Sequence, residues 1–202
     1  MMIETIVFDF GGVLIDWNPR HYYRDVFADD ARMEVFLSEI CDDEWNARLD
    51  RGSSFAVETE RLKARQPAEW HPYIDAYAQG WVRMLGGAIE GSVEILRSLK
   101  GRYRLYGLTN WSAETFPVAR AKFGFLGLFD GIAVSGEEGM IKPDPEFFRL
   151  LCSRYNVAPE KSIFIDDNAR NVEAANALGF NAIRFTSPEA LRQGLEGLGV
   201  TV

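Results

Sequence analysis

Short apolar runs alternate with amphipathic stretches along most of this 202-residue chain. Runs of this kind are typical of strands that are buried on both faces of a parallel sheet. We expect strands at 3–8, 103–108, 131–134, 162–165 and 182–185. We expect helices at 91–100, 113–123, 145–155, 168–178 and 188–195. This order predicts an α/β fold in which a doubly wound parallel sheet is covered by helices on both faces.

The segment from about Asn18 to Leu85 interrupts the alternation. It contains no convincing strand pattern and indicates several amphipathic helices. Helix-breaking residues divide it near positions 29–30, 52–53 and 67. We interpret it as an all-helical cap inserted directly after the first strand. The chain is therefore predicted to consist of a core (1–15 and 86–202) and a cap (16–85).

Charge and composition exclude several classes of partner. The formal net charge is −8, whereas binding to nucleic acid or to an anionic membrane requires clustered Lys and Arg. No apolar run approaches the roughly 18–20 residues that span a bilayer, and no basic leader precedes the first strand. Cys41 and Cys152 lie far apart and indicate reduced thiols in a cytoplasmic protein. We expect a monomer or a weak dimer.

Polar side chains follow four of the predicted strands. Asp9 follows the first strand, Thr109 and Asn110 the second, Lys142 the third, and Asp166 and Asp167 the fourth. Ligands of an open parallel sheet bind at the carboxyl ends of its strands. We therefore expect these side chains to converge at one edge of the sheet.

Convergence would bring three carboxylates together, those of Asp9, Asp166 and Asp167. Each pair of like charges ~4 Å apart costs about 4 kcal/mol at an effective dielectric constant near 20. Lys142 supplies one positive charge, and the remaining charge indicates a hard divalent cation. Oxygen ligands with retained waters suit Mg²⁺, which usually also contacts a substrate phosphate. Only two histidines are present, so a histidine-based metal site is not expected.

The same residue types suit the transfer of a phosphoryl group. Gly11 lacks a side chain, so its backbone can present a carbonyl to a metal or N–H groups to an oxyanion. Thr109 and Asn110 offer a hydroxyl and an amide to phosphate oxygens, and Lys142 is a point-charge phosphate binder. An ionised Asp9 beside a cation is a competent nucleophile, which would pass through an aspartyl-phosphate.

Four motifs in this order, DFGGVL, LTN, the lysine of MIKPDP and IDDNARN, resemble those of the haloacid dehalogenase superfamily. The resemblance covers essentially the whole chain, and the helical insertion lies where the C1 cap of that family belongs. It is closest to C1-capped phosphatases similar to those that act on sugar 1-phosphates. The function it implies is Mg²⁺-dependent removal of phosphate from a small phosphorylated metabolite.

The resemblance also implies roles for individual residues. Asp9 would be the nucleophile, and Lys142 would bridge it to the phosphate. The implied phosphate-binding residues are Gly11, Gly12, Thr109, Asn110 and Lys142, and the implied metal ligands are Asp9, Gly11, Asp166 and Asp167. The motif does not decide whether Asp166 or Asp167 is the direct ligand. Asn171, one helical turn after Asp167, is a candidate supporting residue.

One position departs from the pattern of the family. Phosphatases of the family commonly carry a second Asp two residues after the nucleophile, as general acid and base, and here that position is Gly11. The loss of a general acid/base typically costs about 10²–10⁴-fold in rate. Asp16, His21 or a cap residue could take over the role, and the sequence does not distinguish them.

Two other functions stay open. A 2-haloacid dehalogenase would use Asp9 on carbon without a metal, but the Asp166-Asp167 pair argues against it. A catalytically weak ligand-binding or regulatory protein is supported only by Gly11. The substrate would be chosen by the cap, where Trp45, Arg48 and Arg51 precede the Gly52-Ser53 loop and are the candidate specificity residues.

Overall fold

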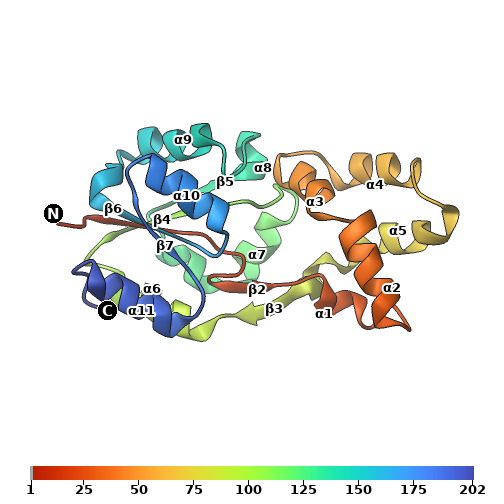
Figure 1. Cartoon of the computed structure of the whole chain (residues 1–202), viewed down its shortest axis with the longest axis horizontal. Coiled ribbons are helices and arrows are strands. Elements are labelled where there is room, and N and C mark those ends of the chain that lie inside the picture. The colour runs from red at the N-terminus through yellow and green to blue at the C-terminus, as the bar shows by residue number, and fades with distance from the viewer. Residues whose placement is uncertain (1) are drawn as a thin grey trace.

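The computed structural model describes residues 2–202, and its centre is a five-stranded parallel sheet in the order β5-β4-β1-β6-β7 (Figure 1). The strands are β1 (Thr5–Phe8), β4 (Arg104–Thr109), β5 (Gly131–Val134), β6 (Ser162–Asp166) and β7 (Asn181–Arg184). Every neighbouring pair is parallel. The predicted doubly wound α/β fold is confirmed, because the chain builds one half of the sheet on each side of β1.

Helices cover both faces of this sheet, as Figure 1 shows. Helices α9 (Pro145–Tyr155) and α10 (Ala169–Ala177) pack on one face; α6 (Glu90–Leu99), α7 (Phe116–Lys122) and α11 (Pro188–Gly197) pack on the other. In β1, Val7 points into the first layer, whereas Ile6 and Phe8 point into the second. Because alternate strand residues point to opposite faces, two covered faces require a continuously apolar strand.

The helical insertion comprises five α-helices between β2 (Ile15–Trp17) and β3 (Leu85–Ala88), and it lies beyond one end of the sheet (Figure 1). The helices are α1 (Arg20–Tyr23), α2 (Asp30–Val35), α3 (Asp43–Asp50), α4 (Phe55–Lys63) and α5 (His71–Gly80). Side chains of Asp29, Asp42 and Ser54 accept hydrogen bonds from the first turns of α2, α3 and α4. These caps explain why the chain restarts a helix at each of the three positions.

The strands β2 and β3 form an antiparallel ribbon that the sequence pattern did not predict. Ile15 pairs with Ala88 and Asp16 with Gly87. Leu85, which we had assigned to a segment without strands, is the first residue of β3. A strand of four residues that includes two glycines carries too little alternation to be recognised. Both predicted boundaries between core and cap fall within this ribbon.

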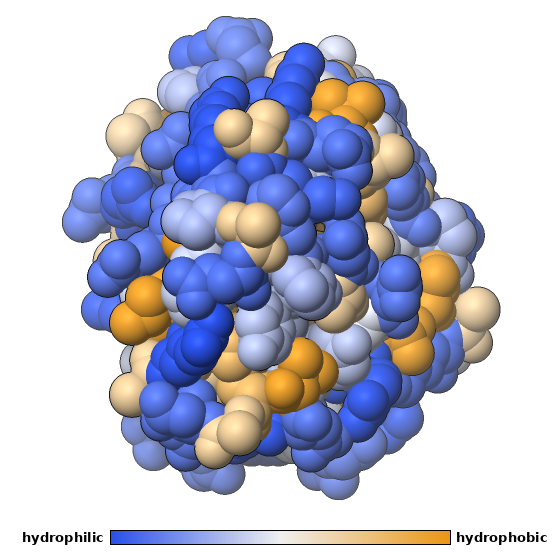
Figure 2. All heavy atoms as spheres, turned by 90° about the vertical axis from the view of Figure 1, so that its right-hand side faces the viewer, coloured by the Kyte–Doolittle hydropathy of each residue, from blue (hydrophilic) through white to orange (hydrophobic). Residues whose placement is uncertain are grey.

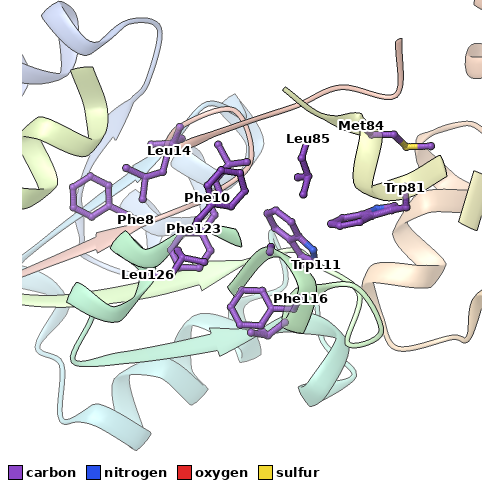
Figure 3. Packing of buried hydrophobic residues seen from close by; sticks show 14 of the residues in the cluster. Phe8, Phe10, Leu14, Trp81, Met84, Leu85, Trp111, Phe116, Phe123 and Leu126 are labelled. Carbon is purple, nitrogen blue, oxygen red and sulfur yellow. The ribbon is translucent and has the colours of Figure 1, made fainter. Parts of the chain in front are cut away.

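Aromatic side chains connect the helical insertion to the core. Trp111, in the loop after β4, packs edge-on against Trp81 at a ring distance of 5.6 Å and against Phe116 of α7 at 6.1 Å. Figure 3 shows Trp111 between these two residues, with Phe10 of the core nearby. The insertion therefore rests on the loop that follows β4 at the carboxyl edge of the sheet.

The far end of the helical insertion is largely polar. Figure 2 views this end, where apolar side chains stand singly among hydrophilic ones. Val35 and Val57 are isolated exposed residues of this kind, which are normal on a protein surface. Among residues 2–202, no helix combines the length and the apolar character that crossing a membrane requires.

Candidate active site

The candidate site lies where β1, β4 and β6 end side by side. Asp9 directly follows β1, Thr109 is the last residue of β4, and Asp166 is the last residue of β6. The chain adds β4 and β5 on one side of β1 and then β6 and β7 on the other side. This reversal is the switch point at which open α/β sheets bind ligands. The topology thus brings together residues that are more than 150 positions apart in the sequence.

Lys142 lies at the centre of the site with a fully buried side chain. Its Nζ is 2.9 Å from Asp9 Oδ1 and 2.7 Å from Asp166 Oδ2. Burial acts against the charge of Lys142, but the two carboxylates outweigh it and raise the pKa of the ammonium group. The site therefore contains a permanent cation that is held between two acids.

Asp9 is buried beside this cation, and its Oδ1 accepts a hydrogen bond of 2.7 Å from the N–H of Phe10. Burial raises the pKa of Asp9 to about 7; Lys142 opposes that rise, and the charge of Asp166 adds to it. The carboxylate of Asp9 is thus poorly solvated, and further positive charge in the site would favour its ionised form.

The three carboxylates predicted to converge do so. One oxygen each from Asp9, Asp166 and Asp167 lies within 4.8 Å of the other two. Asp166 is fully buried, and protein donors engage both of its oxygens. Asp167 as a whole residue is exposed, but its carboxyl group faces the site, where partial desolvation and the charge of Asp166 raise its pKa. One ammonium beside three acids leaves a formal deficit of two positive charges.

Asn171, which the resemblance made a candidate supporting residue, contacts Asp166. Its Nδ2 donates to both oxygens of Asp166 at 3.0 and 3.1 Å. The helix that carries it, α10, is capped by Asn168, whose Oδ1 accepts from the N–H of Arg170. Because Asn168 supplies this cap, the neighbouring acids are not needed for capping and can face the site.

The two glycines after Asp9 have different surroundings. Gly12 adopts φ +71°, and a Cβ atom at this residue would lie 2.4 Å from Asp167 Oδ2. Only glycine fits there, because the carboxylate occupies the space of a side chain. A Cβ at Gly11 would meet no heavy atom within 4 Å beyond its chain neighbours. The place of the missing acid is therefore open.

Thr109 and Asn110 differ in their partners. Thr109 Oγ1 is buried and has no hydrogen-bond partner within residues 2–202, so the hydroxyl is free for a ligand. The amide of Asn110 is engaged on both sides, because it donates to the carbonyl of Lys142 at 3.0 Å and accepts from the N–H of Lys142 at 2.8 Å. Asn110 thus holds the loop that carries Lys142 through its amide oxygen and one of the two N–H groups of its amide.

A cavity of about 80 Å³ separates the carboxyl edge of the sheet from the helical insertion. Its walls combine core and insertion residues. They are Gly11, Trp17, Asn46, Leu49, Asp50, Phe55, Trp81, Asn110, Trp111, Ser112 and Thr115.

The three cap residues suggested by the sequence do not line this cavity. Trp45 is buried against Tyr77, with ring centroids 4.7 Å apart. Arg48 forms ion pairs with Glu58 at 2.9 Å and with Glu44 at 3.2 Å, and Arg51 is exposed. These three residues therefore lie outside this cavity, and a role for them in specificity stays a prediction.

Asn46, Leu49 and Asp50 of α3 face the cavity instead. Their i, i+3, i+4 spacing places them on one face of the helix, while Trp45 and Arg48 lie on adjoining faces. The spacing of these three residues in the sequence already indicated that they share one face of the helix. Which face of α3 turns toward the sheet depends on how the insertion packs.

Comparison with known proteins adds independent findings. A family model described as haloacid dehalogenase-like hydrolase matches residues 3–179. The sesquiterpene phosphatase astK of Aspergillus oryzae is 30% identical over 91% of this chain and 90% of its own length. The drimenol cyclase drtB of Aspergillus calidoustus is 26% identical over 98% of this chain, which spans only 37% of that protein.

The fold also matches solved structures. HAD family enzyme bt-2542 of Bacteroides thetaiotaomicron, in complex with magnesium and inorganic phosphate, superposes with a TM-score of 0.69 at 21% identity. The match covers 92% of this chain and 95% of the other. The similarity extends over the helical insertion as well as the sheet, since nearly the whole of both chains is included.

Proposed function

The chain belongs to the haloacid dehalogenase-like hydrolases, and on this premise we propose that it is a Mg²⁺-dependent phosphatase of a small phosphorylated metabolite. The observation that carries the proposal is the buried Lys142, bound to Asp9 and Asp166 next to the carboxylate of Asp167. One edge of the sheet thus brings together a nucleophile and a fixed cation. The negative charge that remains there would be balanced by a divalent ion.

The donor set fits Mg²⁺. The three carboxylates offer hard oxygen ligands, and one ammonium leaves two negative charges unbalanced. Asp9, Asp167 and the carbonyl of Gly11 would hold the ion directly. Asp166 would act mainly by fixing Lys142, because its oxygens already accept hydrogen bonds from protein donors. When bound, Mg²⁺ neutralises charge on the carboxylates and on the phosphoryl oxygens.

The residues of the chain then supply the chemistry. Asp9 attacks phosphorus and forms an aspartyl-phosphate, which water hydrolyses. Lys142 and the free hydroxyl of Thr109 hold the phosphoryl oxygens. The backbone N–H of Gly11 adds a donor to the same group, whereas the N–H of Gly12, also predicted to bind phosphate, already donates to the carbonyl of Ile15 at 2.9 Å. Asn110 keeps Lys142 in position through its two hydrogen bonds.

The known proteins support this assignment. The astK relative is named a phosphatase, and the chain aligns with nearly all of it. The bt-2542 enzyme was crystallised with magnesium and inorganic phosphate. For a dehalogenase, by contrast, the unneutralised Asp167 would repel a carboxylate substrate.

We also propose that the helical insertion acts as a cap. Sites for small molecules usually measure roughly 300–1,000 Å³, whereas the cavity here is about 80 Å³. This space is small for a whole metabolite, which supports movement of the insertion on the β2–β3 ribbon when substrate enters. Small-angle scattering with Mg²⁺ and a phosphate mimic should show a more compact particle than the free protein.

The dependence on Mg²⁺ is tested with a panel of phosphorylated metabolites. We expect release of phosphate with Mg²⁺, loss of release in EDTA and recovery when Mg²⁺ is added back. Binding of Mg²⁺ to the folded protein should also raise its Tm, since a ligand at 100 times its Kd adds about 2.7 kcal/mol to the free energy of unfolding. Turnover that persists in EDTA would refute the proposal, and metal-free halide release from an L-2-haloacid would indicate the dehalogenase instead.

Thr109→Val separates ligand binding from stability. The hydroxyl of Thr109 is buried without a protein partner, so its loss should leave Tm unchanged or raise it. The affinity for inorganic phosphate or vanadate should fall roughly tenfold, as for the loss of a hydrogen bond of about 1.4 kcal/mol. Calorimetry with Mg²⁺ present measures both quantities. Thr109→Ser is the matched control and should retain the affinity.

A further inference from the structure

The group that protonates the leaving alcohol is missing from its usual place. Gly11 stands two residues after the nucleophile, and the space of its absent side chain is open. Asp16 and His21 were two substitutes suggested by the sequence. They pair with each other at 2.9 Å and do not line the cavity. A third candidate, the carboxylate of Asp50, lines the same cavity as Gly11 but comes from the helical insertion rather than from the core.

We propose that Asp50, at the end of α3 in the helical insertion, is the general acid and base of the reaction. This inference rests on the proposed phosphatase function and assigns the proton transfer to a residue of the insertion rather than of the core.

The core holds the backbone of Asp50 in place. The hydroxyl of Ser135 donates to the carbonyl of Asp50 at 2.6 Å and accepts from the N–H of Trp111 at 2.8 Å. Gly52, at φ +100°, lies so close to the core that a Cβ atom would be 2.9 Å from the carbonyl oxygen of Gly136. The end of α3 is therefore docked beside the loop that carries Asn110, and Asp50 has a defined position over the site.

The side chain of Asp50 has the surroundings that proton transfer requires. Asn46 Nδ2 donates to its Oδ2 at 3.0 Å. Burial raises the pKa of Asp50 to about 7, against the opposing effects of Lys142 and the backbone N–H of Ser112. A general acid and base works best when its pKa lies close to the pH of the reaction.

The two steps balance as follows. Asp9 attacks phosphorus, the bond from phosphorus to the leaving oxygen breaks, and the proton of Asp50 passes to that oxygen to give the alcohol. Ionised Asp50 then takes a proton from water as the water oxygen attacks phosphorus. The bond from phosphorus to Asp9 breaks, inorganic phosphate leaves, and Asp9 is ionised and Asp50 protonated again.

The test compares leaving groups in Asp50→Asn. An alkyl phosphate needs protonation of its leaving oxygen, so its cleavage should slow by about 10²–10⁴-fold. The first turnover of p-nitrophenyl phosphate needs little protonation and should stay within a few-fold of the wild-type rate. The second step also loses its base, so phosphorylated Asp9 should accumulate and be detected by mass spectrometry after acid quenching.

Matched variants make the outcome decisive. Asp43→Asn, on the exposed part of α3, should change none of these rates. Asp50→Ser, which keeps the backbone contact to Ser135, should reproduce the leaving-group dependence. Gly11→Asp in the Asp50→Asn background restores a carboxylate from the core and should recover alkyl phosphate cleavage by at least about tenfold.

Two results would overturn the assignment. If Asp50→Asn slows the cleavage of both esters equally and no phosphorylated Asp9 accumulates, Asp50 has only a structural role. If Asp50→Asn cleaves both esters at the wild-type rate, Asp50 takes no part in proton transfer. In either case the wild-type enzyme would still hydrolyse both esters with Mg²⁺, so the phosphatase function would stand. A wild-type protein that cleaves neither ester would overturn both proposals.

Discussion

Asp9→Asn is expected to abolish turnover of phosphate esters, with a loss of at least about 10⁴-fold, because the proposed covalent intermediate forms on the carboxylate of Asp9. The measurement is initial rate with Mg²⁺ on the best substrate of the panel, together with a search for phosphorylated protein. No phosphoenzyme should be detectable in the variant. A residual rate within tenfold of the wild type would show that Asp9 is not the nucleophile.

The same variant should remain folded. Asp9 is one of three acids around a single ammonium, and Lys142 keeps its second partner, Asp166, at 2.7 Å. Removing one negative charge reduces the crowding, so Tm in the absence of Mg²⁺ should not fall and is expected to rise. Loss of activity with an unchanged or higher Tm separates a catalytic role from a structural one.

Lys142→Met is expected to have the largest effect on stability. It leaves Asp9 and Asp166 buried without their common cation, and breaking a buried ion pair by removing one partner costs about 3–5 kcal/mol. For a chain of this size the Tm should fall by roughly 6–20 °C. Thermal unfolding in EDTA measures the change, and phosphate release should also be lost.

Controls for Lys142→Met are available in the same chain. Lys161 pairs with Glu4 at the surface, so Lys161→Met should change Tm little. Addition of Mg²⁺ should recover part of the stability of Lys142→Met, because the ion supplies positive charge to the same acids. The double variant Asp9→Asn/Lys142→Met should lose less stability than Lys142→Met alone. If it loses more, the cost does not arise from uncompensated carboxylates.

The architecture and the members of the carboxyl edge could be predicted from the sequence because both depend on local patterns. Apolar runs such as IVF before Asp9 and IFI before Asp166 mark strands that are buried on both faces. A parallel sheet places the ends of such strands at a common edge, so the meeting of Asp9, Lys142 and Asp166 follows from connectivity alone. The exact pairing in the sheet was not needed for that prediction.

Roles within the site depended on contacts that spacing does not reveal. Phosphate binding by Asn110 stays a prediction, whereas the two hydrogen bonds by which its amide holds the backbone of Lys142 could not be seen in the sequence. The β2–β3 ribbon went unrecognised because its short strands, β3 with two glycines, carry no periodic signal. Asp166 and Asp167 were indistinguishable in the sequence, and only their burial and hydrogen bonds separate them.

The sequence by itself determined the α/β class, the helical insertion and the set of acids around Lys142. The periodicity of apolar residues and the order of the strands are sufficient for these three predictions. Only the tertiary structure decided which face of α3 meets the sheet, and with it that Asp50 rather than Trp45, Arg48 or Arg51 lines the cavity. The rotation of a helix about its axis is set by packing against the rest of the protein, here through Ser135 and Gly136. Those partners lie about 85 residues further along the chain, beyond the reach of any local pattern.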